Sequence, residues 1–202
     1  MDRLTVCGQE RHSFRLLPEF TKMLSRNANP AVLALGWLRP AGWSAAAFLL
    51  LLPMVGMVFE DRLHWGVNWT AGDFLAAAVL LGGTGAALEV AVRLSGNLAY
   101  RAGAFVAVGA ALVLVWANLA VGLVGSEGNP ANLWFMVVPV VGLVMAALGR
   151  FTSQGLVRAM LAMVVAQIVA GVAVGGTVEA VAITLVWTGA WLASAWLFRR
   201  AC

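Results

Sequence analysis

The chain has 202 residues, of which 62% are hydrophobic and 11% are charged, and its formal net charge is +4. Soluble domains carry about 25% charged residues, and a soluble globule of this size has no means of burying so much apolar surface. The basic residues form no dense stripe interleaved with aromatic side chains, so the composition excludes a typical nucleic-acid-binding surface. We therefore predict an integral membrane protein, whose principal partner is the lipid bilayer.

The N-terminal part of the chain precedes the first membrane-length apolar segment. Residues 13–26 place apolar side chains at helical spacing, with basic side chains elsewhere on the wheel. This pattern is typical of an amphipathic helix on the inner leaflet. Two alternatives stay open, an unstructured leader and a start of translation at Met23. The predicted organisation is a cytoplasmic lead, residues 1–41, followed by a membrane domain, residues 42–202.

Six apolar segments approach the length of about 20 residues that a spanning helix needs. They do not alternate between apolar and polar residues as barrel strands do, so helices are expected to satisfy the backbone within lipid. The predicted fold class is an all-α, polytopic transmembrane helix bundle. In one alternative, residues 156–198 hold a single span and a re-entrant segment. The predicted spans are residues 42–59, 73–92, 102–124, 131–149, 156–174 and 178–198.

The positions of the basic residues predict the orientation of the bundle. If there are six spans, all of the 13 Lys and Arg residues except Arg62 fall on one side. Loops rich in Lys and Arg stay on the cytoplasmic side of a membrane. The sequence therefore predicts that both ends of the chain lie in the cytoplasm and that the protein is a multi-pass protein of a bacterial cytoplasmic membrane.

A few polar side chains lie within the predicted spans, where each is costly and needs a reason. Glu89 is followed one helical turn later by Arg93, Thr84 and Gln167 lie near the midplane, and Asn118 lies in the outer half of its span. In the functional interpretation these five residues line a polar path, with Glu89 as a proton or cation site. In the structural interpretation Glu89 and Arg93 form an interfacial ion pair, and the other residues form hydrogen bonds between helices.

The most distinctive motif is residues 125–133, which read GSEGNPANL. Asn129 suits the N-cap of a helix and Pro130 suits its first position, which predicts a tight outer turn that begins the fourth span. The alternative is a small outer-face site built from four polar residues of this turn: Ser126, Glu127, Asn129 and Asn132.

The sequence contains none of the common catalytic, phosphate-binding or zinc-binding motifs. It contains no nucleophile elbow, no phosphate-binding glycine loop and no paired histidines at zinc-binding spacing. We therefore predict no catalytic residues, no metal site, no cofactor and no enzymatic activity.

Two pairs of arginines repeat along the chain. Arg93 and Arg150 have the same separation in the sequence as Arg101 and Arg158, which would follow from a duplicated hairpin or simply from evenly sized spans.

Three motifs of the chain resemble those of a group of small bacterial inner-membrane proteins of unassigned function. They are residues 72–74 (GDF), 96–102 (GNLAYRA) and 125–133. The usual form of the third motif in that group is GSEDNPANL, and Gly128 replaces its second acidic residue here. The resemblance implies the location and the multi-span fold, but it supplies no activity.

Two functions of different classes fit these observations. A small-solute or ion transporter, or a subunit of one, requires the polar side chains of the spans to face one shared cavity. At 21.2 kDa the chain is small for a carrier, so a homodimer or another membrane protein is expected as a partner. A non-catalytic membrane scaffold or assembly partner would instead act through loops such as residues 126–132.

Overall fold

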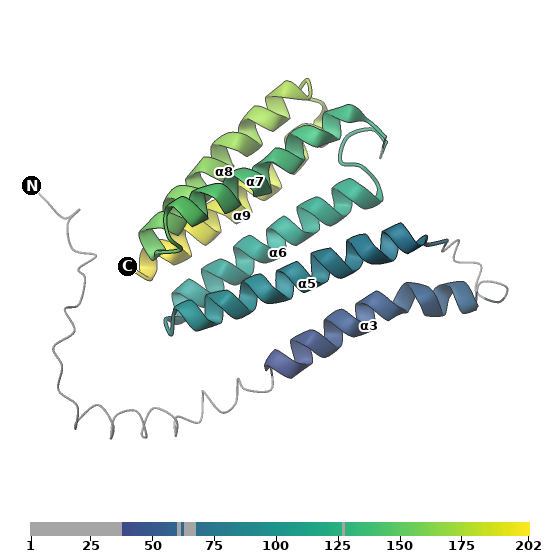
Figure 1. The fold of residues 1–202 in the computed structure, drawn as a ribbon. Helices are drawn as coiled ribbons and strands as arrows, with labels where there is room; N and C mark the ends of the chain where they lie inside the picture. The colour runs from purple at the N-terminus through teal and green to yellow at the C-terminus, as the bar shows by residue number, and fades with distance from the viewer. Residues whose placement is uncertain (1–37, 60–61, 63–67, 127) are drawn as a thin grey trace, which may run out of the picture. The chain divides into compact units, whose positions relative to one another are not determined.

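The computed structural model describes residues 38–59, 62, 68–126 and 128–202 (Figure 1). Within these ranges the chain is helical and has no strand, and six helices are long and apolar enough to cross a membrane. The predicted fold class is thereby confirmed. The amphipathic helix predicted at residues 13–26, and Met23, lie outside the described residues.

Short connections join α5 to α6, α7 to α8 and α8 to α9. α8 has 21 residues and α9 has 23, so each is a full span and the alternative with a re-entrant segment is wrong. In chain order the elements are α3 (Leu38–Val58), α5 (Ala71–Leu94), α6 (Leu98–Ala120), the 3₁₀ turn η1 (Pro130–Asn132), α7 (Leu133–Leu148), α8 (Ser153–Ala173) and α9 (Val178–Arg200).

The third span begins and ends about one turn earlier than the predicted residues 102–124. The side chain of Asn97 accepts a hydrogen bond from the amide of Ala99 at 2.8 Å, which fixes the start of α6 ahead of its first arginine. At the other end Gly122 adopts a positive φ of 72°, which ends the helix although the residues that follow are apolar. Local capping therefore overrides hydropathy at both ends of this span.

The chain divides into two compact units, and α5 crosses the boundary between them. The N-terminal unit comprises residues 1–85 and the C-terminal unit residues 86–202. In the N-terminal unit, Thr70 and Asp73 form a reciprocal cap at the start of α5. The amide of Thr70 donates to Asp73 Oδ2 at 2.7 Å, and the amide of Asp73 donates to Thr70 Oγ1 at 3.3 Å. Further along α5, the ring of Trp43 from α3 packs directly on Gly85, where even a methyl group would come within 2.8 Å of it.

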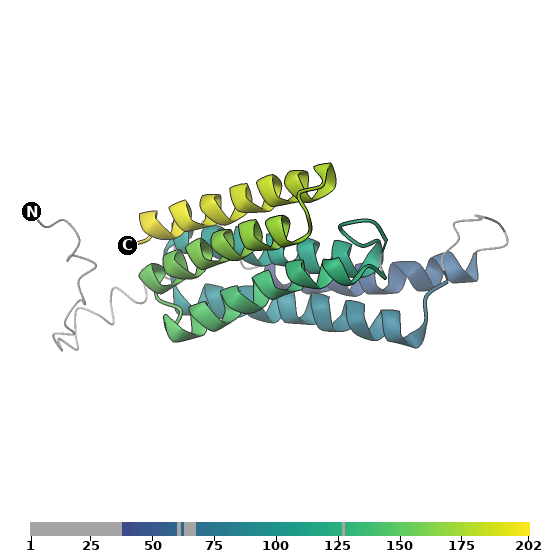
Figure 2. The same cartoon turned by 90° about the horizontal axis from the view of Figure 1, so that it is seen from above.

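The C-terminal unit is a helix bundle in which α9 packs against α6 and α8, and α8 packs against α7 (Figure 2). Its core is lined by large side chains that are fully buried, among them Leu114, Phe135, Trp191 and Phe198. The outward faces carry side chains such as Leu143 and Leu185 that are about two-thirds exposed, at 67% and 68%. Apolar side chains exposed along a whole helix are suited to contact with lipid tails.

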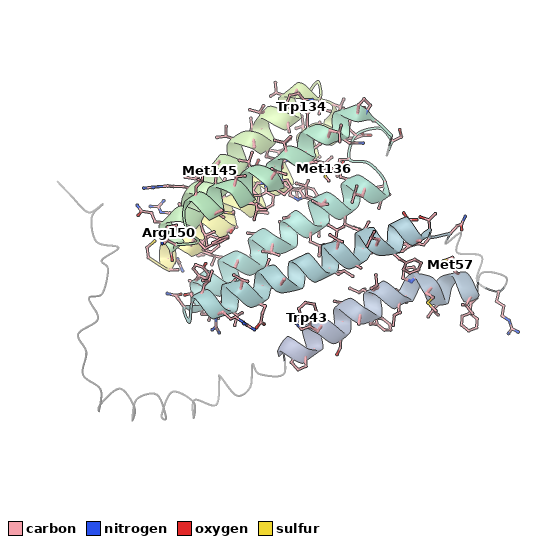
Figure 3. All side chains as sticks on the ribbon, in the orientation of Figure 1. Trp43, Met57, Trp134, Met136, Met145 and Arg150 are labelled. Atoms are coloured by element: carbon pink, nitrogen blue, oxygen red, sulfur yellow. The ribbon has the colours of Figure 1, made fainter. Side chains whose placement is uncertain are left out.

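The arginine-rich turns of the C-terminal unit meet at one end. The α5–α6 turn, the α7–α8 turn and the C-terminus lie together in both ribbon views (Figures 1 and 2). Tyr100 links them, because its hydroxyl donates to the carbonyl of Phe151 at 2.8 Å and its ring packs edge-on against Phe198. Arg150 lies at this end of α7 and Trp134 at the opposite end (Figure 3). This grouping agrees with the predicted charge asymmetry, while the orientation in the membrane stays a prediction.

Candidate functional site

The loop between α6 and α7 is organised by the side chain of Asn132, which is only 4% exposed. Its Oδ1 accepts hydrogen bonds from the amides of Leu123 at 3.0 Å and Val124 at 2.9 Å, and its Nδ2 donates to the carbonyl of Ser126 at 2.8 Å. One side chain therefore pairs three backbone groups of the loop that follows α6. This is a structural clamp at the point where the chain reverses direction.

Asn129 makes the second set of contacts in the same loop. Its Oδ1 accepts from the amide of Ala131 at 3.0 Å, and its Nδ2 donates to the carbonyl of Val124 at 3.1 Å. The predicted N-cap at Asn129, with Pro130 in the first position, is confirmed, although the turn that follows is 3₁₀ and α7 begins at Leu133. Gly125 has φ +73°, so a side chain there would strain the backbone and also crowd Asn129.

The predicted outer-face site is therefore only partly available to a ligand. Asn129 and Asn132 use both their oxygen and their nitrogen atoms on the backbone of the loop, and Ser126 is exposed. Glu127 lies outside the described residues. Asn118, predicted as part of the polar path, instead joins this end of the bundle, because its Nδ2 donates to the carbonyl of Asn132 at 3.0 Å. A ligand site formed by the four loop residues stays a prediction.

Glu89 and Arg93 form the ion pair that their spacing of four residues predicts. Arg93 Nε lies 2.8 Å from Glu89 Oε1, and the side chain of Arg93 is 72% exposed. Such an i,i+4 pair contributes only about 0.3–0.5 kcal/mol to helix stability when it is exposed. The pair lies near the end of α5, close to the arginine-rich end of the C-terminal unit.

Gln167 has a different environment from the other polar residues in the spans. It lies in α8 with no exposed surface, and the indole Nε1 of Trp191 in α9 donates to its Oε1 at 3.5 Å. Its Nε2 has no hydrogen-bond partner among the described residues. A buried amide nitrogen without a partner is costly, typically about 1–3 kcal/mol. This side chain is therefore the strongest candidate for contact with a ligand or with water.

The sequence analysis missed the polar face of α9 that surrounds Gln167. Thr184, Thr188 and Trp191 recur at intervals of four and three residues, which places them on one face of the helix. The buried hydroxyl oxygens of both threonines have no hydrogen-bond partner among the described residues. The helical spacing of polar residues within the last predicted span was the signal that could have revealed this face.

Two further polar side chains of α9 have partners in α6. The hydroxyl of Ser194 is fully buried and donates to the carbonyl of Gly103 at 2.9 Å, and the indole of Trp187 donates to the carbonyl of Ala110 at 3.0 Å. These bonds fasten α9 to α6. α9 therefore has two polar faces. One is hydrogen-bonded to α6, and the other contacts Gln167 of α8.

Four of the five residues predicted to line a polar path make contacts at three separate places in the C-terminal unit. Glu89 pairs with Arg93, Asn118 binds the loop at the opposite end, and Gln167 meets Trp191. Thr84 belongs to the N-terminal unit and is half-buried. A path that joins all five stays a prediction.

Among the described residues, no group of three or more His, Cys, Asp or Glu side chains is placed to hold a metal ion. In comparisons with known proteins, no family model, no curated protein and no solved structure matches this chain.

Proposed function

We propose that this integral membrane protein transports a small solute or ion, or is a subunit of such a transporter. The observation that carries the proposal is the fully buried Gln167, whose Nε2 lacks a partner among the described residues. Polar groups within a membrane bundle are costly, and those that are retained commonly mark the pathway of a substrate. The bundle would lie in the bacterial cytoplasmic membrane with both ends inside, and its small size favours assembly as a homodimer or with another membrane protein.

A flux assay with the purified full-length chain in proteoliposomes tests this function. Urea and glycerol entry is followed by light scattering, and Na⁺ and K⁺ entry by trapped fluorescent dyes. We expect at least one flux above that of protein-free vesicles, and a loss of about tenfold or more in Gln167→Leu, because the variant removes the polar group that the solute would contact.

Ser194→Ala is the matched control for that assay. It also removes a fully buried polar group, but the hydroxyl of Ser194 is already bonded to the carbonyl of Gly103. The flux should therefore survive in Ser194→Ala. Fluxes equal to those of empty vesicles for all four solutes, or equal losses in both variants, would contradict the proposal.

A second function, a non-catalytic scaffold or assembly partner, is favoured by the loop between α6 and α7. Asn129 and Asn132 hold the backbone of this loop in a defined shape and leave Ser126 exposed on it. A rigid exposed loop is suited to recognition by another protein. If the scaffold function is correct, a photo-crosslinker at Ser126 should capture one discrete protein in native membranes, while every flux stays at the level of empty vesicles.

A further inference from the structure

The seam between α8 and α9 brings three unpartnered polar groups into register. Gly171 of α8 packs against Thr184 of α9, with Thr184 Oγ1 nearest to the position that a methyl group on Gly171 would take. The two helices are joined by a short turn and run antiparallel (Figure 2). One helical turn from Gly171 towards the start of α8 is Gln167, and one turn onward from Thr184 in α9 is Thr188. Gln167 and Thr188 therefore belong to the next layer of the same seam.

The indole of Trp191 favours one orientation of the Gln167 amide. An indole N–H is a donor only, so the oxygen of the amide must face it. This is the arrangement found, with Trp191 Nε1 donating to Gln167 Oε1 at 3.5 Å. The group left without a partner is consequently Nε2, which is a donor and selects a hydrogen-bond acceptor.

The seam between α8 and α9 has no charged side chain close to it along either helix, which bears on the charge of a ligand. Along the α8–α9 hairpin, residues 159–178 and 180–198 contain no ionisable Asp, Glu, Lys, Arg or His. Arg158 precedes Gln167 by nine residues, which is about 13 Å along a helix. Glu179 and Arg199 lie near opposite ends of α9. A desolvated cation at this depth would meet an amide N–H and no counter-charge on either helix, and an isolated ion in such surroundings is strongly disfavoured.

We infer that Gln167, Thr184 and Thr188 form a buried site at the α8–α9 seam for a neutral, hydrogen-bond-accepting molecule, either water or a small uncharged solute. Nε2 of Gln167 donates to it, and the two threonine hydroxyls donate or accept as its chemistry requires. Gly171 keeps the seam narrow by removing side-chain bulk beside Thr184. If the site binds the transported solute, the inference rests on the proposed function and restricts that solute to uncharged molecules. If the site holds water, the inference does not depend on transport.

Hydroxyl-radical footprinting of the full-length protein in lipid nanodiscs, in water labelled with ¹⁸O, tests for the site. A side chain buried from bulk solvent is modified in this experiment only if water lies beside it. Trp191 and Phe135 both have no exposed surface, and Phe135 belongs to α7 rather than to α8 or α9. We expect ¹⁸O incorporation at Trp191, and at least a roughly threefold loss of it in the double variant Thr184→Val/Thr188→Val, which keeps shape but removes both hydroxyls. Phe135 should stay unmodified in both proteins.

Added solutes identify the occupant. If excess urea or glycerol lowers the modification of Trp191 more than that of the exposed Trp196, the site takes an uncharged solute, and if neither does, the site holds water alone. An unmodified Trp191 in the wild-type protein would overturn the inference, as would unchanged modification in a correctly folded double variant. Protection of Trp191 by Na⁺ or K⁺ but not by the neutral solutes would overturn the assignment of a neutral ligand.

Comparison with the flux assay separates this inference from the proposed function. If Trp191 is modified but Gln167→Leu leaves every flux unchanged, the site stands and transport through it fails. If Trp191 is not modified while the flux depends on Gln167, transport stands and the site as described fails.

Discussion

We expect Gly155→Ala to destabilise the C-terminal unit by about 3 kcal/mol, because the end of α7 and the start of α8 touch there through backbone alone. A methyl group at Gly155 would lie 2.5 Å from the carbonyl oxygen of Gly149 and 2.7 Å from its Cα. That oxygen also accepts hydrogen bonds from the amide and the hydroxyl of Thr152, at 3.1 Å and 2.8 Å. The backbone has no rotamer to change, so relief requires the two helices to separate.

Two other glycine substitutions provide matched controls for this prediction. The atoms nearest to a methyl group at Gly142 belong to the flexible side chain of Met163, which can move, so Gly142→Ala should cost less. Gly189 in α9 has nothing within 4 Å of the added methyl group, so Gly189→Ala should be neutral or slightly stabilising. Thermal unfolding in detergent, followed by tryptophan fluorescence, gives the order of the three variants. A melting temperature of Gly155→Ala equal to that of Gly189→Ala would show that α7 and α8 do not cross as closely as described.

The second large effect is expected at Asn132. Asn132→Ala leaves the amides of Leu123 and Val124 without their acceptor and the carbonyl of Ser126 without its donor. Each buried group deprived of its partner costs about 1–3 kcal/mol, so a total loss of roughly 2–4 kcal/mol is expected after partial rehydration of the loop. Hydrogen exchange at Leu123 and Val124 should accelerate by about tenfold or more, because these amides open locally.

Two variants bracket the effect at Asn132. Asn132→Asp keeps an oxygen that can accept from both amides but places its second acceptor oxygen against the carbonyl of Ser126, so Leu123 and Val124 should exchange more slowly than in Asn132→Ala. Ser126→Ala changes an exposed side chain of the same loop and should stay close to wild type. If the amides of Leu123 and Val124 remain protected in Asn132→Ala, the clamp does not hold the loop.

The comparison of sequence with structure shows which signals are local and which are not. The number and type of spans were predictable from hydropathy and arginine placement, because both signals lie within a single span of about 20 residues and the loops beside it. The cap at Asn129 and the ion pair of Glu89 with Arg93 were also predictable, since each depends on neighbours within four residues. The early end of α6 was not predicted, because the acceptor for the amide of Val124 is Asn132, eight residues away.

The polar seam depended on information that no single span contains. Gln167 was visible as a polar residue near the midplane, but its partner Trp191 lies 24 residues away on another helix. Similarly, the contact of Gly149 with Gly155 depends on the geometry of the turn between them, in which Arg150 and Phe151 both adopt positive φ angles of 52° and 54°. Hydropathy identifies helices, whereas the register between them depends on side-chain packing.

Cysteine labelling from the two sides of the membrane tests the membrane-spanning arrangement most directly. Ser126 and Cys202 are separated by α7, α8 and α9, so three crossings would place them on opposite sides. Ser126→Cys is made together with Cys7→Ser and Cys202→Ser, and Cys202 is probed in Cys7→Ser alone. With an impermeant maleimide, we expect the thiol introduced by Ser126→Cys to be labelled from outside spheroplasts, and Cys202 to be labelled only after permeabilisation. Labelling of both positions from the same side would contradict the three crossings, and the reverse pattern would contradict the orientation.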